Sequence, residues 1–272
     1  MHGTPAAGSF EDDVRRGDLA WAAGQVDTAL YMYVLALQRS PNDALTLAKI
    51  GEIHQSQGHI EIAIQAFELA HAADPKEPRI AERLGLLYLR MGRVNEAEAL
   101  FKAALAADPS RWQALDGMAE VARLHGSLDR AMAYEDRALQ GKGVNPTLVL
   151  EHRGHIELLL GRLSGAEADL RASIRMLAQP DAYRYLAEVQ VREHDNAGAY
   201  ESLTKTMGVP AAYDQLGLML MSVHDYRAAA DYFEKAISAS PNRNESAEKN
   251  LSIAQEKLAQ PAGNSSAIHA KF

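Results

Sequence analysis

Two histidines have the spacing in this sequence that most suggests chemistry. His152 and His155 stand three residues apart beside Glu151, so a helix would carry both imidazoles on one face, where they could hold a metal ion. The sequence offers no third ligand nearby and contains no His-Glu-x-x-His motif. This favours two histidines that contact a partner or water over a metal centre.

The remaining candidates for chemistry have simpler interpretations. The segment Gly141-Lys142-Gly143 lacks the spacing and the following Ser or Thr of a phosphate-binding loop, so it is interpreted as a linker. His194 and His224 stand at expected turns. The chain has no cysteine, which excludes thiolate metal sites, cysteine nucleophiles and disulfides. With no nucleophile, base and orienting acid in one place, we expect a non-enzymatic protein without a cofactor or a metal.

Charge and hydrophobicity narrow the class of partner. The 272 residues carry a formal net charge of −8, which disfavours nucleic acid and favours a protein or peptide partner. No stretch approaches the ~18 apolar residues of a membrane span, so no membrane insertion is expected. The N-terminus has no apolar core of signal-peptide length before Glu11. We expect a cytoplasmic protein, or a periplasmic or envelope-associated one if an export signal was removed.

The elements that position these residues follow from a repeat. Seven times, a Gly or Ala is followed twelve places later by Ala, and the starting points are 34, 34, 34, 35, 33 and 30 residues apart. A unit of about 34 residues is therefore repeated almost from end to end. The seven pairs are Gly17/Ala29, Gly51/Ala63, Gly85/Ala97, Ala119/Ala131, Gly154/Ala166, Ala187/Ala199 and Gly217/Ala229.

Further positions keep the same period. A turn residue stands inside each pair: Gly24, Gly58, Gly92, Gly126, Gly161, His194 and His224. Four places after each second Ala comes a large residue, apolar except in one unit: Tyr33, Phe67, Phe101, Glu135, Leu170, Leu203 and Phe233. Gly ends a helix through the left-handed conformation, and Pro ends the next one. Each unit is thus predicted to be two antiparallel helices that bury their apolar faces only when stacked on neighbours.

This pattern resembles the tetratricopeptide repeat. The match is best in Leu84-Gly85-x-x-Tyr88 with Gly92, Ala97, Phe101, Ala104 and Pro109, and again in Leu216-Gly217 with Ala229, Phe233, Ala236 and Pro241. The resemblance implies an all-α fold, an α-solenoid in which about seven helix-turn-helix units form a right-handed superhelix and a C-terminal helix caps them.

The chain is expected to divide into four parts. Residues 1–9 form a flexible N-terminus, 10–243 the seven repeats, 244–259 a capping helix, and 260–272 a disordered tail. The two glycines at Gly141 and Gly143 indicate a looser junction, where a change such as Gly143→Ala is expected to cost little. Gly85→Leu, by contrast, is expected to overpack a close contact between helices.

The resemblance also implies a concave groove lined by the first helix of each unit. By register, the groove residues are Lys49, Glu52, Arg79, Glu82, Arg83, Leu86, Arg90, Glu120, Arg123, His152, His155 and Tyr185. Lys49, Arg79, Arg83 and Arg90 form a basic patch that could receive an acidic or C-terminal peptide. Alternatively, these cations pair with Glu52 and Glu82 and present a neutral, solvated face.

We therefore expect a protein–protein interaction scaffold, an adaptor that binds a partner segment in its groove. The Ala-, Leu- and Arg-rich composition is similar to that of bacterial tetratricopeptide proteins that assist assembly of an envelope machine such as a pilus or secretion system. The alternative is a regulatory or structural subunit of an enzyme complex. RNA binding is disfavoured by the acidic balance and by the lack of a repeated base-reading position.

Overall fold

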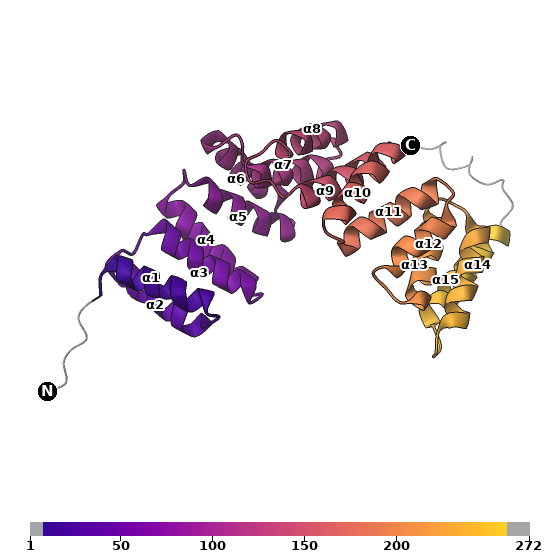
Figure 1. Ribbon diagram of the computed structural model, residues 1–272, viewed down its shortest axis with the longest axis horizontal. Helices are drawn as coiled ribbons and strands as arrows, with labels where there is room; N and C mark the ends of the chain where they lie inside the picture. The colour runs from indigo at the N-terminus through magenta and orange to yellow at the C-terminus, as the bar shows by residue number, and fades with distance from the viewer. Residues whose placement is uncertain (1–7, 260–272) are drawn as a thin grey trace, which may run out of the picture. The chain divides into compact units, whose positions relative to one another are not determined.

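The computed structural model describes residues 8–259, and over that range the chain is helical, with fifteen α-helices and no strand (Figure 1). It divides into two compact units between Val144 and Asn145. The segment expected to be flexible lies outside the described residues except for Gly8 and Ser9, and the expected tail at 260–272 lies wholly outside them. Ser9 begins the first helix, because its side chain accepts a hydrogen bond from the Asp12 amide.

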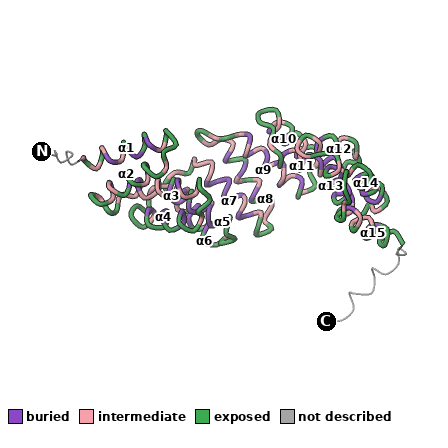
Figure 2. The backbone as a smooth tube through the Cα atoms, turned by 90° about the horizontal axis from the view of Figure 1, so that it is seen from below, coloured by how far each residue is buried: buried purple, intermediate pink, exposed green. Residues whose placement is uncertain are grey.

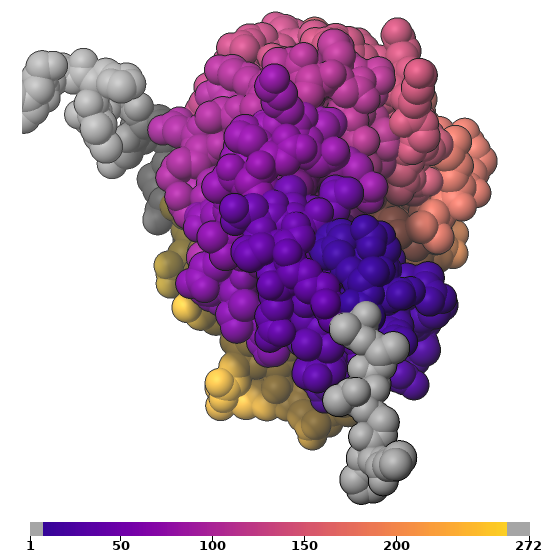
Figure 3. Space-filling model, turned by 90° about the vertical axis from the view of Figure 1, so that its left-hand side faces the viewer, coloured from indigo at the N-terminus to yellow at the C-terminus, as the bar shows by residue number. Residues whose placement is uncertain are grey.

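The first unit contains four helical hairpins. Its helices are α1 (Phe10–Ala22), α2 (Val26–Arg39), α3 (Ala44–Ser56), α4 (Ile60–Ala73), α5 (Pro78–Arg90), α6 (Val94–Ala107), α7 (Trp112–Leu124) and α8 (Leu128–Ala138). Each odd-numbered helix packs on the helix that follows it, and successive hairpins join through α2 with α3, α4 with α5, and α6 with α7. In the space-filling view, the indigo atoms near the N-terminal end lie directly against the purple atoms of the residues that follow (Figure 3).

The second unit contains three hairpins and a final helix. Its helices are α9 (Pro146–Leu159), α10 (Leu163–Met176), α11 (Pro180–Arg192), α12 (Asn196–Thr204), α13 (Val209–Ser222), α14 (Tyr226–Ala239) and α15 (Glu245–Ala259). The last helix packs on α14 and α13 and buries Ala247 and Ala254 against them. The predicted all-α solenoid is confirmed, whereas the hand of its superhelix stays a prediction.

A residue with a positive φ angle follows the first helix of each hairpin. The φ angle lies between 63° and 78° at Gly24, Gly58, Gly92, Gly126, Gly161, His194 and His224. The predicted turn role of the two histidines is thereby confirmed. Gly143 also has a positive φ, of 64°. The expectation that Gly143→Ala costs little is therefore wrong, because a side chain in this conformation is strained by roughly 1–2 kcal/mol.

The small residues of the repeat make room for the large ones. A Cβ atom added to Gly85 would lie 2.8 Å from the Phe101 ring, and Gly51 stands in the same relation to Phe67. The Phe101 ring also lies against Gly117 of the following hairpin, so one ring packs inside its own hairpin and against the next. Buried stretches recur along the helices, while the turns are exposed (Figure 2).

Each unit has apolar clusters of its own. The largest in the first unit gathers around Phe67, Leu87 and Phe101, and the largest in the second gathers around Leu216 and Phe233. Glu135 occupies the position of the ring in the fourth hairpin and is buried. None of the described helices combines the length and the apolar character needed to cross a membrane.

Candidate functional site

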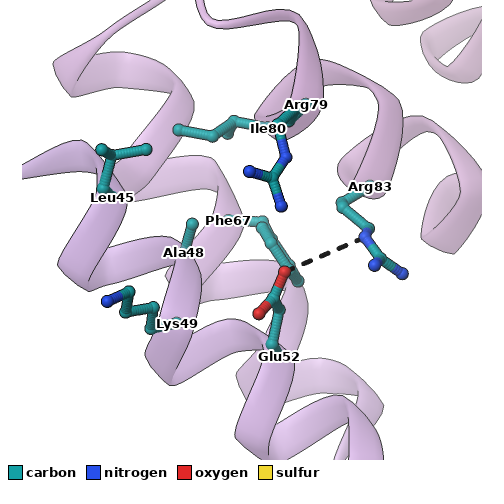
Figure 4. A pocket seen from close by; sticks show the side chains of 8 residues that line it. All are labelled: Leu45, Ala48, Lys49, Glu52, Phe67, Arg79, Ile80 and Arg83. Carbon is teal, nitrogen blue, oxygen red and sulfur yellow. Dashed lines mark ion pairs between the residues drawn. The ribbon is translucent and has the colours of Figure 1, made fainter. Parts of the chain in front are cut away.

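Four of the predicted groove residues meet at one pocket in the first unit. Lys49 and Glu52 come from α3, and Arg79 and Arg83 come from α5, around a cavity of about 150 Å³ (Figure 4). The remainder of the lining is apolar and consists of Leu45, Ala48, Phe67 and Ile80. The pocket therefore combines an apolar base with a charged rim.

Local sequence explains why the two helices present these side chains together. Asp43 caps the start of α3 by accepting a hydrogen bond of 2.8 Å from the Thr46 amide. Pro78 occupies the first turn of α5, where its missing amide hydrogen costs nothing. Residues three or four apart share a helix face, so Lys49 with Glu52, and Arg79 with Arg83, point to the same side.

The two arginines keep most of their capacity to bind an anion. The Arg79 guanidinium makes no ion pair with any described residue, and it points toward Glu52 and Phe67 (Figure 4). Arg83 Nε lies 4.0 Å from Glu52 Oε1, and both side chains are more than one-third exposed. An exposed pair at this distance is weak, so Arg83 can exchange Glu52 for a ligand.

Lys49 is already bound. Its ammonium group donates a hydrogen bond to Asp18, which also accepts one of 2.7 Å from the Tyr33 hydroxyl. Burial opposes ionisation of Asp18, but the hydrogen bonds from Lys49 and Tyr33 outweigh it and lower the pKa of the carboxyl group. The lysine thus contributes less positive charge to the pocket than the arginines do.

Register placed Glu82 in the groove, where it could pair with the groove cations. This prediction is wrong, because Glu82 is buried and pairs with Arg111. Its side chain is only 4% exposed and binds Arg111, whose Nη2 lies 2.6 Å from Glu82 Oε2. Burial raises the pKa of the Glu82 carboxyl group, and the hydrogen bond and charge of Arg111, together with the charges of Arg83 and Arg79, only partly oppose that rise. Glu82 thus pairs with Arg111, and of the ion pairs that the neutral interpretation required, only the long contact between Arg83 and Glu52 is present among the described residues.

The other predicted residues of the first unit lie outside the pocket. Arg90 is exposed in the last turn of α5 and does not line the cavity, so three of the four expected cations meet there. Leu86 is partly buried against the main apolar cluster. Glu120 and Arg123 bind each other through two hydrogen bonds of 2.6 Å.

The second unit holds a separate aromatic surface. The His155 ring stacks on Tyr185, with centroids 4.0 Å apart and ring planes 16° apart, and the Arg184 guanidinium lies 4.3 Å from the Tyr185 centroid. His152 stands one turn before His155 on α9 and is partly buried. Stacked planar groups of this kind suit contact with a peptide or with another aromatic ring.

Two partners of the site escaped sequence reasoning. Arg111 precedes α7 and belongs to no repeated position, so nothing in its spacing links it to Glu82. Phe67 was recognised as a packing residue, yet its ring also forms the base of the pocket. The repeat period identifies positions that recur in every hairpin but cannot identify a contact made in one hairpin only.

Comparison with known proteins identifies the repeat. A tetratricopeptide repeat profile matches residues 48–109 and 82–146, and a second one matches 210–243. No curated protein matches the sequence.

Among solved structures, a tetratricopeptide repeat protein from Parabacteroides merdae is 20% identical, with a TM-score of 0.63 over 90% of this chain and 98% of that one. PilW, a type IV pilus biogenesis factor, is 17% identical, with a TM-score of 0.64 over 76% of this chain and 98% of its own. The pilF protein of Pseudomonas aeruginosa is also 17% identical, with a TM-score of 0.60 over 79% and 97%. At these identities the likeness establishes the fold.

Proposed function

Since the chain belongs to the tetratricopeptide repeat family, whose fold is that of a protein–protein interaction scaffold, we propose that it is a non-enzymatic adaptor for an acidic segment of a partner protein. One observation carries the proposal: Arg79 and Arg83 stand over an apolar pocket with little internal neutralisation. Such a pocket matches a segment in which a carboxylate lies close to an apolar side chain.

The charges of the pocket favour this segment over a neutral one. Glu52 is its only acidic lining residue, while Lys49, Arg79 and Arg83 are cationic. A carboxylate that reaches both arginines would replace the long Glu52 contact with charge-assisted hydrogen bonds, typically worth about 1.5–3 kcal/mol. The apolar base would supply additional binding through Phe67 and Ile80.

Participation in pilus assembly is the finer part of the proposal. Its support is the likeness to PilW and to the pilF protein, together with the composition of the chain. The alternative, a subunit of an enzyme complex, predicts enzymes rather than envelope proteins among the captured partners.

The test reverses the charge of the pocket. The double variant Arg79→Glu/Arg83→Glu should lose the partner that the wild-type chain captures from the source organism, as identified by mass spectrometry. Both side chains are exposed, so the melting temperature should stay within the range of surface substitutions. The matched control is Arg130→Glu on α8, an exposed arginine without an ion pair among the described residues.

Two outcomes decide the proposal. The proposal is supported if the pocket variant loses the partner and the Arg130→Glu control retains it. The wild-type complex should then weaken as the salt concentration is raised. If the pocket variant retains wild-type affinity at low salt, recognition occurs elsewhere, with the His155 and Tyr185 surface as the next site to vary.

A further inference from the structure

A second pocket lies in the second unit, on the face of α11 that points away from the aromatic surface. Tyr183, Leu186 and Gln190 line it and share one side of α11, whereas Tyr185 occupies the opposite side. The cavity has a volume of about 530 Å³ and is completed by residues of α10 and α12. That volume is within the range of small-molecule sites, which span roughly 300–1,000 Å³.

The hollow exists because α12 is short and has small side chains. This helix has 9 residues, whereas the second helices of the flanking hairpins, α10 and α14, have 14 each. Gly198 and Ser202 face the cavity. In the next hairpin, the places equivalent by repeat register hold Ala228 and Tyr232, which are both larger.

Polar groups form the floor of this cavity. Gln190 and Ser202 are 6% and 7% exposed, and the Ser202 Oγ atom lies 2.8 Å from the Gln190 amide. An added Cβ at Gly198 would come within 2.7 Å of this amide. With the Gln190 amide oriented so that its nitrogen donates to Ser202 Oγ, the Ser202 hydroxyl hydrogen stays free to donate to a ligand oxygen.

Three cations stand at the rim. Arg171 and Arg175 lie one turn apart on α10, and Lys205 follows the end of α12. Arg175 makes no ion pair with any described residue, while Arg171 and Lys205 pair with Glu167 and Glu201 on their own helical turns. Exposed pairs between residues four apart contribute only about 0.3–0.5 kcal/mol, so a ligand can displace them.

The acidic residues of the lining are less available to repel an anion. Asp195 accepts a hydrogen bond of 2.9 Å from the Gly198 amide, so its charge already stabilises the start of α12. Glu201 lies 3.3 Å from Lys205. The two arginines thus face the cavity with guanidinium groups whose planar geometry suits phosphate oxygens.

From this arrangement we propose that the pocket formed by α10, α11 and α12 binds a small organic phosphate. Arg171 and Arg175 bind the phosphate group, and Ile174, Tyr183 and Leu186 contact the organic part. A cavity of this volume is too large for inorganic phosphate alone, and its apolar wall gives the organic part a surface to cover. The site is independent of the arginine pocket of the first unit.

The test uses phenyl phosphate as the probe and the full chain as the protein. Titration followed by calorimetry and by backbone amide NMR should show saturable binding with a Kd of about 1 mM or lower. Amides of α10 and α12 should shift. Inorganic phosphate has only the phosphate group of the probe, and phenol has only its aromatic ring, so each should bind more weakly than phenyl phosphate.

Matched variants connect the binding to the pocket. Arg171→Met/Arg175→Met should weaken phenyl phosphate binding at least about tenfold, because charge-assisted hydrogen bonds are lost. Arg227→Met, at an exposed arginine of α14 without an ion pair among the described residues, should leave it unchanged. Equal binding of phenyl phosphate by both variants would indicate an adventitious ion only and would overturn the proposal. Binding that does not saturate would also overturn it, and so would phenol that binds as tightly as phenyl phosphate.

Discussion

The contact between Gly85 and Phe101 predicts a large effect of one substitution. Gly85→Leu should lower the free energy of unfolding by about 3 kcal/mol, because even the first added atom would lie 2.8 Å from a fully buried ring. Chemical denaturation monitored by circular dichroism measures this difference.

The control is the same substitution at an open position. Gly208 has φ of −69°, and an added Cβ would meet no atom within 4 Å. Gly208→Leu should therefore cost less than about 1 kcal/mol. Equal losses at the two positions would contradict the packing of Phe101 on Gly85.

The buried pair of Glu82 and Arg111 predicts a pH-dependent defect. Arg111→Met should lower stability by about 3–5 kcal/mol at pH 7, since it leaves a buried carboxylate without its cation. Burial already raises the pKa of Glu82, and loss of Arg111 raises it further. A carboxyl group with a raised folded pKa stabilises the fold when protonated and loses that contribution as pH rises through this pKa.

The defect should consequently shrink as the pH is lowered toward the raised pKa of Glu82. Melting temperatures of wild type and variant at pH 7 and pH 5 test this. Lys102→Met removes a largely exposed partner of Glu98 and should cost no more than about 1 kcal/mol at pH 7. A defect that is independent of pH would mean that Arg111 acts through packing alone.

At the residue scale, the sequence predicted positions better than pairings. Register placed Lys49, Glu52, Arg79 and Arg83 together, because a repeat fixes which helix faces adjoin. It did not predict that Glu82, next to Arg83, is buried, or that Asp18 binds Lys49. Adjacent residues on a helix point about 100° apart, and the long side chains reach partners on other helices that no period encodes.

At the scale of elements, α15 supplies the next prediction. It covers α14 and α13 and is fastened by Asn250, whose amide donates to Asp214. Truncation after Arg243 removes Leu251 and Ala254, so it should expose apolar surface around Phe233 and cause aggregation detectable by light scattering. Truncation after Ala259 leaves this helix in place and should preserve a monodisperse sample.

If both truncated chains stay monodisperse, α15 does not act as a cap. If both aggregate, residues beyond Ala259 contribute to solubility, and the role assigned to α15 is again wrong. Melting temperatures separate loss of the helix from loss of solubility, because removal of packed surface lowers stability as well.

The boundaries of the elements were the most predictable part of the fold. Gly24 and its equivalents end first helices because glycine adopts a positive φ at little cost, and His194 and His224 take the same conformation at the same place. Gly143 also has a positive φ, but it does not occupy a repeated position, so its conformation could not be predicted from the repeat. Gly117 was likewise missed, because its contact with Phe101 crosses to a neighbouring hairpin.

At the scale of the whole molecule, the two compact units predict independent folding. Each has its own buried clusters, around Phe101 in one and Phe233 in the other. The fragments 1–144 and 145–272 should each give a helical circular dichroism spectrum and a cooperative thermal transition. A fragment without a cooperative transition would show that its unit needs the rest of the chain.

The packing of each ring on the glycine of its own hairpin also has a kinetic consequence. Phe67 meets Gly51, and Phe233 meets Gly217, within one pair of neighbouring helices, so these contacts close short loops. Chains rich in contacts of short sequence separation have low contact order and fold in microseconds to milliseconds. Folding can therefore begin in any hairpin in which the aromatic ring packs on the glycine, and then spread to the neighbouring hairpins. The order in which the hairpins fold need not follow their order in the sequence.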